Sequence, residues 1–324
     1  MADGFFDFPD NPKPDNGSCA FLIARDGVRL RYGRFEPPPG THRGTVIILS
    51  GRNESIEKYF ETIRDLNRRG LACIKMDWRG QGGSGRLLRD SSRGYVRSFD
   101  DYVRDLDRLF TQVVLPDCRG PHFLLAHSTG ALIALLAAPI LANRVRRMVL
   151  IAPLLSLVGL PLGMKGISRL MTTLYWLGFG RMYAYGGPRP VESPPFETNK
   201  LTSDRGRFAR NVALVKAHPD LGLGGPTVAW VRAACIASAK VSRPDFRARI
   251  RIPTLFIAAG ADEVVSRQAV EDYARSIRTG RLVTIDGARH EILQEADIYR
   301  EQALAAFDAF VPGSDAERYA ATEA

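Results

Sequence analysis

Residues 123–141 read FLLAHSTGALIALLAAPIL, and this stretch decides the fold class. It begins with a short apolar run at residues 123–126, typical of a strand that is covered on both faces. It ends with an apolar run at residues 131–141 that is long enough for a helix and apolar on every side. A short turn of small and polar residues separates the two runs. The stretch therefore predicts a buried strand that turns sharply into a buried helix.

Strands and helices alternate on both sides of this stretch. Near the N-terminus, the Asp26-Gly27 pair between two short runs predicts a hairpin with a tight turn. Further strands are predicted at residues 45–49, 71–76, 145–152, 254–259 and 281–285. Helical apolar patterns connect most of these strands, and strands joined through helices form parallel sheets. The sequence therefore predicts an α/β fold with a mostly parallel sheet and helices on both faces.

The alternation stops after residue 153 and resumes near residue 246. The residues between contain helical apolar patterns mixed with many Gly and Pro residues, and they do not continue the wound sheet. An insertion late in such a sheet is expected to cover the strand ends as a cap. We predict a core of residues 1–153 and 246–311, a cap (lid) of residues 154–245 and a flexible tail of residues 312–324.

The chain has 324 residues and a net charge of +10, from 45 basic and 35 acidic side chains. Its arginines are scattered and form no recognition motif, so a nucleic-acid partner is not expected. A diffuse positive charge fits peripheral contact with an anionic membrane surface, although a bias toward arginine codons would also explain it. The N-terminus lacks a basic segment followed by an apolar one, so a cytoplasmic location is expected. The sequence leaves the oligomeric state open.

Open parallel sheets bind ligands at the carboxyl ends of their strands, so the residues after each strand are candidates for chemistry. Ser128 lies in such a turn, within Ala126-His127-Ser128-Thr129-Gly130. This turn is a degenerate form of the G-x-S-x-G nucleophile elbow, with Ala126 in place of the first glycine. The positive end of the following helix favours the negative charge that forms when a serine attacks an ester. Ser128 is therefore the candidate nucleophile, and an ordinary strand-to-helix turn is the alternative.

A serine nucleophile needs a base to take its proton and an acid to orient that base. His290 is the candidate base, because it alone among the five histidines follows the last strand in a glycine-led loop. Asp262 is the candidate acid, because it follows the preceding strand and gives the chain order Ser, Asp, His that α/β-hydrolases use. Its neighbour Glu263 is a rival, and Asp286 is a weaker one. The side chain of His127 is expected to point away from the nucleophile.

An oxyanion hole needs two backbone N–H groups, one of them from the residue after the nucleophile. That residue is Thr129, and the second donor is expected to be Arg52, in the loop after the strand at residues 45–49. Asn53 and Glu54 in the same loop are interpreted as a helix cap and a first-turn charge rather than as part of the chemistry.

Several motifs in order resemble the bacterial inner-membrane lysophospholipases, within the monoacylglycerol-lipase-like α/β-hydrolases. The resemblance lies in residues 51–55 (GRNES), 77–86 (DWRGQGGSGR), 126–128 (AHS) and 287–293 (GARHEIL), and in the cap at residues 195–196, 201–202, 210–211 and 224–230. It implies a triad of Ser128, Asp262 and His290 acting on glycerolipid esters, with no metal or organic cofactor. Thr129 and Ala131 depart from the family, which more often has Met and Gly there. Monoacylglycerol lipases have His-Gly where this chain has Ser50-Gly51, which puts the second oxyanion donor in doubt.

The cap offers a second indication of the substrate. Residues 154–185 are rich in Leu, Met, Trp and Tyr and include Lys165, Arg169 and Arg181, which suits an acyl chain with an anionic head. Packing of the cap onto the core explains the same apolar residues equally well. Trp230 is expected to line the acyl pocket or to pack within the cap.

The expected function is a serine carboxylic-ester hydrolase, either a lysophospholipase or a monoacylglycerol lipase, acting on a lipid or other acyl ester. A serine peptidase or amidase of the same superfamily is the alternative, since the same triad cleaves amides. A ligand-binding protein that uses this scaffold without catalysis is a further alternative.

Overall fold

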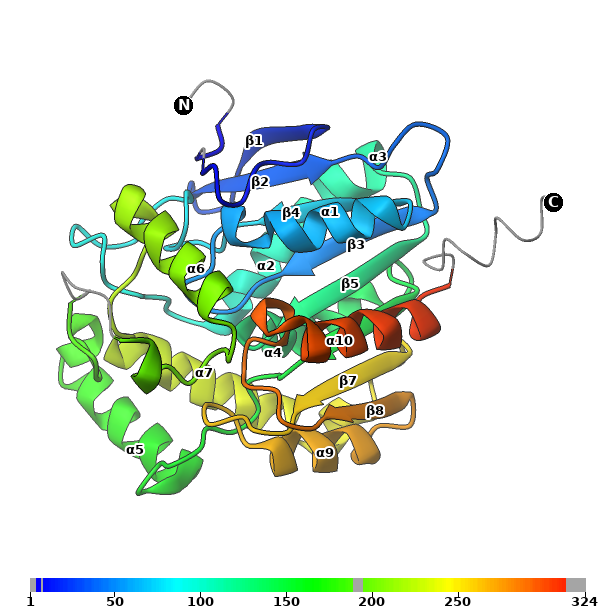
Figure 1. Ribbon diagram of the computed structural model, residues 1–324. Helices are drawn as coiled ribbons and strands as arrows, with labels where there is room; N and C mark the ends of the chain where they lie inside the picture. The colour runs from blue at the N-terminus through cyan, green and yellow to red at the C-terminus, as the bar shows by residue number, and fades with distance from the viewer. Residues whose placement is uncertain (1–3, 7, 189–194, 313–324) are drawn as a thin grey trace.

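The computed structural model describes residues 4–6, 8–188 and 195–312 of the chain. A sheet of eight strands runs through them in the order β1-β2-β4-β3-β5-β6-β7-β8 (Figure 1). The strands are β1 (Gly17–Ile23), β2 (Arg29–Phe35), β3 (Gly44–Leu49), β4 (Leu71–Met76), β5 (His122–His127), β6 (Arg147–Ile151), β7 (Thr254–Ala259) and β8 (Gly280–Ile285). β1 and β2 form the predicted antiparallel hairpin, β2 joins β4 antiparallel, and every other pair is parallel. The predicted mostly parallel sheet is confirmed.

Helices cover both faces of this sheet, which explains why every residue of β3, β4 and β7 is buried. In Figure 1, α1 (Phe60–Arg68) and α10 (Asp297–Phe310) lie in front of the sheet, and α2 (Phe99–Leu109) and α4 (Thr129–Leu141) lie behind it. α3 (Leu115–Asp117) and α9 (Arg267–Ser276) complete the core helices. α2 begins at Ser98 with a capping box: Ser98 accepts from the backbone N–H of Asp100, and Asp101 accepts from that of Ser98.

The junction of β5 and α4 is packed closely against β3. A Cβ atom on Gly130 would lie 2.1 Å from the carbonyl oxygen of Leu49, so only glycine allows this approach. Leu49 also pairs with Ala126 across the sheet. Nearly all of α4 is buried, as its apolar sequence predicts. The loops after β3 and β5 are therefore held side by side.

The described residues between β6 and β7 contain four α-helices. They are α5 (Gly163–Trp176), α6 (Arg205–Ala217), α7 (Val228–Val241) and α8 (Pro244–Arg247). In Figure 1, α5, α6 and α7 gather beyond the carboxyl ends of the parallel strands, on the left. Asp204 caps α6 by accepting from the N–H of Arg207, and Thr227 caps α7 by accepting from that of Trp230.

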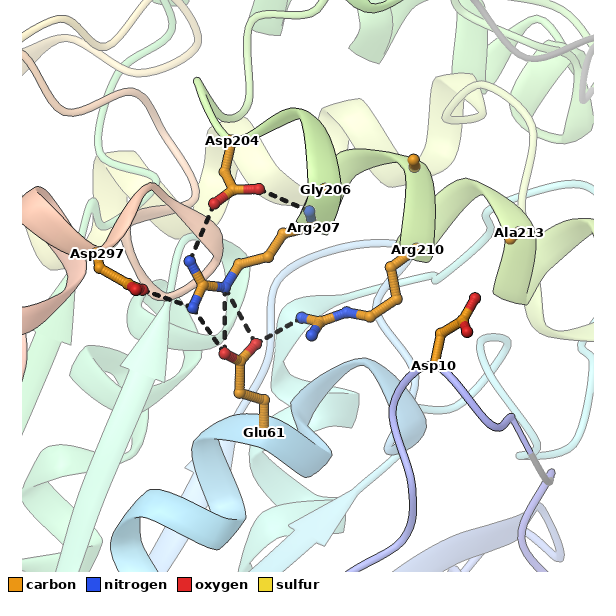
Figure 2. A pocket seen from close by; sticks show the side chains of 9 residues that line it. Asp10, Glu61, Asp204, Gly206, Arg207, Arg210, Ala213 and Asp297 are labelled. Carbon is orange, nitrogen blue, oxygen red and sulfur yellow. Dashed lines mark hydrogen bonds and ion pairs between the residues drawn. The ribbon is translucent and has the colours of Figure 1, made fainter.

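Charged side chains join α6 to the core. Glu61 of α1 accepts hydrogen bonds of 2.7 Å from Arg207 and from Arg210 (Figure 2). Arg207 also pairs with Asp204 at 3.1 Å and with Asp297 at the start of α10 at 2.7 Å. These side chains line an open hollow of about 580 Å³ between α1 and α6. The hollow lies at this junction, and Ser128 and His290 are not among its lining residues.

No described helix has both the length and the apolar character that crossing a bilayer requires. A span needs about 20 consecutive apolar residues, whereas α5, α7 and α10 have 14 residues each. Of the flexible tail predicted at residues 312–324, all but residue 312 lies outside the described residues.

Candidate active site

Ser128 occupies a strained backbone position between β5 and α4. Its φ of 50° and ψ of −113° lie where side chains other than glycine rarely occur. Backbone hydrogen bonds to neighbouring segments hold this conformation. The N–H of Ser128 donates to the carbonyl of Ile151 at 2.9 Å, and the carbonyl of Ser128 accepts from the N–H of Leu132 at 3.1 Å. The turn predicted from the sequence thus has the geometry of a nucleophile elbow.

His290 bridges Ser128 and Asp262. Its Nε2 lies 2.9 Å from Ser128 Oγ, and its Nδ1 lies 2.8 Å from Asp262 Oδ2. The other carboxylate oxygen of Asp262 accepts from the N–H groups of Val264 and Val265 at 2.8 and 2.9 Å, which fixes the carboxylate toward the imidazole. A carboxylate on Nδ1 leaves Nε2 as the nitrogen that can accept the hydroxyl proton.

The rival acids from the sequence lie elsewhere. Glu263 is exposed and pairs with Lys200 at 3.3 Å. The side chain of Asp286 is 92% exposed and lies 3.9 Å from Arg267. Among the three carboxylates considered, the structure brings Asp262 to His290.

The backbone N–H groups of Arg52 and Thr129 lie in the two loops that β3 and β5 hold side by side. Among the described residues, neither group donates to an acceptor. Thr129 is the first residue of α4, where backbone N–H groups have no partner within the helix. Both groups are therefore free to donate to a bound oxygen.

The sequence did not reveal a buried charged network behind the serine, centred on Glu54. One carboxylate oxygen of Glu54 accepts from the N–H of Gly51, from Tyr59 Oη at 2.8 Å and lies 3.3 Å from His127 Nδ1. The other accepts from Lys58 Nζ at 3.1 Å. Burial favours the neutral acid, but the charges of Lys58 and His127 outweigh burial and hold the pKa of Glu54 well below its usual value.

His127 connects this network to the candidate base. Its Nε2 lies 3.1 Å from the carbonyl oxygen of His290, and the two imidazole rings are 4.9 Å apart. Burial lowers the pKa of His127, but the Glu54 charge outweighs burial and raises it above its usual value. The printed partners of the His127 ring are Glu54 and the carbonyl of His290 and not the Ser128 hydroxyl, so His127 supports the loop that carries the candidate base without contacting the nucleophile.

The interpretation of Asn53 and Glu54 as helix-capping residues is wrong. The helical turn spans Glu57–Tyr59 and has no side-chain cap at Ile56, so Glu54 lies before its first turn, and Asn53 accepts from the N–H of Leu223 at 2.6 Å. Glu54 and Lys58 are four residues apart, a spacing typical of a helical ion pair. The spacing of Glu54 and Lys58 was the available signal in the sequence. It does not identify a buried network, because ion pairs on exposed helices have the same spacing.

Trp230 on α7 lies beside Arg52, which is in the loop after β3. Trp230 is 7% exposed, with its ring 5.6 Å from that of Phe99 and 5.6 Å from the Arg52 guanidinium carbon. Ser128 and His290 are 7% and 4% exposed, so the site is covered in this structure.

Comparisons with known proteins identify the family of this chain. A family model described as serine aminopeptidase, S33, matches residues 40–297. Lysophospholipase L2 of Escherichia coli (strain K12) is 35% identical over 86% of this chain and 83% of its own length. A probable lysophospholipase L2 of Haemophilus influenzae is 28% identical over 90% of this chain and 91% of its own length.

A solved structure supports the same assignment at the level of the fold. A soluble variant of monoglyceride lipase from Saccharomyces cerevisiae aligns with a TM-score of 0.71 over 92% of this chain and 97% of that chain. Its sequence is 18% identical, so the likeness concerns the fold alone. The family match and the relatives in the two bacteria cover most of the chain, and this chain therefore belongs to the serine aminopeptidase, S33, family of α/β-hydrolases.

Proposed function

We propose that this protein is a serine carboxylic-ester hydrolase that cleaves an acyl ester through an acyl-enzyme. The observation that carries the proposal is the position of His290, within hydrogen-bonding distance of both Ser128 Oγ and Asp262 Oδ2. The strained backbone of Ser128 and the two unoccupied N–H donors beside it support the same chemistry.

In this mechanism His290 Nε2 takes the hydroxyl proton while Ser128 Oγ attacks the acyl carbonyl carbon. The carbonyl oxygen becomes negative, and the N–H groups of Arg52 and Thr129 donate to it. Asp262 holds the imidazole and stabilises its charged form. The imidazolium then returns its proton to the leaving alcohol, and water releases the acyl group by the same steps.

Residues 154–245 act as a cap over a core of residues 1–153 and 246–311 in this proposal. Support comes from the low exposure of Ser128 and His290 and from the place of α5, α6 and α7 beyond the strand ends. Trp230, buried beside Arg52, is a candidate wall of the acyl pocket.

The proposed substrate is a lysophospholipid or a monoacylglycerol, in line with the printed names of the bacterial relatives and the yeast structure. We also propose peripheral contact of the cytoplasmic protein with an anionic membrane. Large apolar side chains of the cap support this contact, because they are exposed beside Lys165, Arg169 and Arg181. They are Val158, Leu162, Leu170, Trp176, Leu177, Phe179, Met182 and Tyr185.

The test compares wild type with Ser128→Ala and His290→Ala, using a fluorophosphonate label and a short p-nitrophenyl ester. We expect labelling of wild type alone, and a fall in ester hydrolysis of about 10⁴-fold or more in both variants. Circular dichroism of the variants controls for folding. Labelling that persists in Ser128→Ala would contradict the proposal.

An aminoacyl arylamide in the same assay tests the second candidate, a peptidase or amidase. The description of the matching family as a serine aminopeptidase favours including it. We expect a higher kcat/KM for the ester. A higher kcat/KM for the arylamide would replace the esterase by a peptidase while leaving the same residues in place.

A further inference from the structure

The side chain of Arg52 lies half-buried between the core and the cap, without a counter-charge. Its Nη2 donates to the carbonyl of Gly224, and its guanidinium carbon lies 5.6 Å from the ring of Trp230. Its Nε is buried and has no hydrogen-bond partner. Among the described residues no carboxylate forms an ion pair with it, and the ionisable groups that act on its charge are the phenols of Tyr102, Tyr183 and Tyr185.

The fully buried arginines among the described residues, Arg31, Arg79 and Arg300, have acidic partners. Arg31 pairs with Glu57 at 2.8 Å and with Asp77 at 2.6 Å. Arg79 pairs with Asp105 at 2.6 Å. A buried charge without a partner is costly, and in most proteins it is paired. Arg52 therefore needs an explanation that these arginines do not.

Burial lowers the pKa of Arg52 to about 10, so the guanidinium keeps its charge at neutral pH. Lysine, the other strongly basic side chain, would lose its proton more readily on burial. A guanidinium also presents several N–H donors in a plane that matches the oxygens of a phosphate.

The position of Arg52 relates this charge to the substrate. Its backbone N–H is the proposed oxyanion donor, so its side chain starts beside the acyl carbonyl and extends toward Gly224 and Trp230 under the cap. In a lysophospholipid the phosphate is separated from the acyl carbonyl by the glycerol backbone alone. An extended arginine side chain spans a distance comparable to that between the acyl carbonyl and the phosphate.

We propose that Arg52 determines headgroup specificity by binding the phosphodiester of a lysophospholipid, so that the enzyme prefers this substrate to a neutral monoacylglycerol. This inference rests on the proposed esterase function and deepens it. The phosphate supplies the missing counter-charge and accepts from the unpartnered Nε. A neutral glycerol ester leaves the guanidinium unpaired and is the poorer substrate.

The experiment compares two substrates with the same decanoyl chain, a lysophosphatidylglycerol and a monoacylglycerol, both kept monomeric so that membrane attraction plays no part. The ratio of their kcat/KM values is measured in wild type, Arg52→Gln and Arg52→Lys. Arg232→Gln is the matched control, because the Nε of Arg232 on α7 also lacks a partner and its guanidinium carbon lies 4.6 Å from the Tyr175 ring.

Arg52→Gln is expected to lower the ratio of lysophospholipid to monoacylglycerol kcat/KM by about 10- to 100-fold, the range for losing a charge-assisted hydrogen bond. Any effect on the oxyanion loop lowers both rates and cancels in the ratio. Arg52→Lys is expected to retain only part of the preference, because it keeps a positive charge but loses the planar set of donors, and Arg232→Gln leaves the ratio unchanged. An unchanged ratio in Arg52→Gln overturns the inference.

Inhibition of p-nitrophenyl ester hydrolysis in wild type gives a second measurement that needs no variant. Glycerol 3-phosphate is expected to compete with the ester more strongly than glycerol and inorganic phosphate. No difference from glycerol overturns the inference, and equal inhibition by inorganic phosphate assigns the site to free phosphate instead. Absence of ester hydrolysis and of fluorophosphonate labelling in wild type would instead refute the proposed function.

Discussion

Glu54 holds three parts of the candidate site through one carboxylate. Its oxygens contact the N–H of Gly51 in the oxyanion loop, His127 beside the serine, and Lys58. Lys58 also pairs with Glu291, the residue after His290, at 2.7 Å. The loops after β3, β5 and β8 therefore share one buried set of charges.

Glu54→Gln is expected to lower kcat for a p-nitrophenyl ester by about 10- to 100-fold, because the oxyanion loop loses its anchor. It is also expected to destabilise the fold by about 3 kcal/mol, because Lys58 and His127 lose a buried counter-charge. Ester kinetics and urea unfolding measure the two effects.

Glu263→Gln is the matched control, because Glu263 lies close to Asp262 in the chain but forms an exposed pair with Lys200. Neither kcat for the p-nitrophenyl ester nor the free energy of unfolding should change appreciably in this variant. If Glu54→Gln were to lose stability and keep its kcat, Glu54 would support the fold without positioning the site.

At the residue scale, the sequence predicted the residues that the structure brings together as Ser128, Asp262 and His290. Each lies in the turn or loop that follows a strand, so a strand prediction also indicates which edge of the sheet carries the side chain. It did not predict the partners of Glu54, because a Glu four residues before a Lys looks the same on an exposed helix as in a buried network. The burial of this pair depends on β8 and its loop, more than 200 residues away.

At the scale of elements, strands of the core were predicted with small errors at their ends. β4 and β7 match the predicted ranges, and β5 extends one residue beyond its range at each end. These strands are mostly apolar because helices cover them on both faces, and an apolar run is a local pattern. The arrangement of α5, α6 and α7 was not predictable in the same way, since α6 is joined to α1 by charged side chains that give no periodic signal.

The junction of α6 and α1 should depend on pH. Burial raises the pKa of Glu61, but hydrogen bonds from Arg207 and Arg210 outweigh burial and lower it to about 2. A carboxyl whose pKa is lower in the folded state stabilises the fold above its unfolded pKa, near 4.5, and loses that contribution as pH falls toward 2.

Glu61→Gln is therefore expected to reduce the free energy of unfolding at pH 7 by about 1–2 kcal/mol, after allowing for solvent screening. The difference from wild type should stay constant down to about pH 4.5 and shrink below it. Urea unfolding across this range measures it. Glu301→Gln, which removes a 62% exposed carboxylate near Arg300, is the control and should show no such change. A difference that grew as the pH fell would contradict the assigned direction.

At the scale of the whole molecule, net charge and the exposed apolar side chains of the cap point to the same kind of surface. The chain carries a net charge of +10. Trp176 and Leu177 at the end of α5 are 75% and 65% exposed, and exposed apolar groups next to basic ones suit the boundary between headgroups and acyl chains. Binding of the protein to an anionic bilayer would bring the proposed cap close to the proposed lipid substrate.

Replacing Trp176 and Leu177 together by Ser is expected to reduce pelleting with phosphatidylglycerol vesicles by about tenfold or more, because two apolar side chains no longer enter the interface. Hydrolysis of a monomeric ester should be unchanged, since neither residue contacts the candidate site. Ile298→Ser is the matched control, because Ile298 is 70% exposed on α10, outside residues 154–245. Added salt should weaken binding of wild type, since the Debye length falls to about 10 Å at 0.1 M. Equal pelleting of wild type and the double variant would show that another surface carries the contact, because the charge of the two proteins is the same.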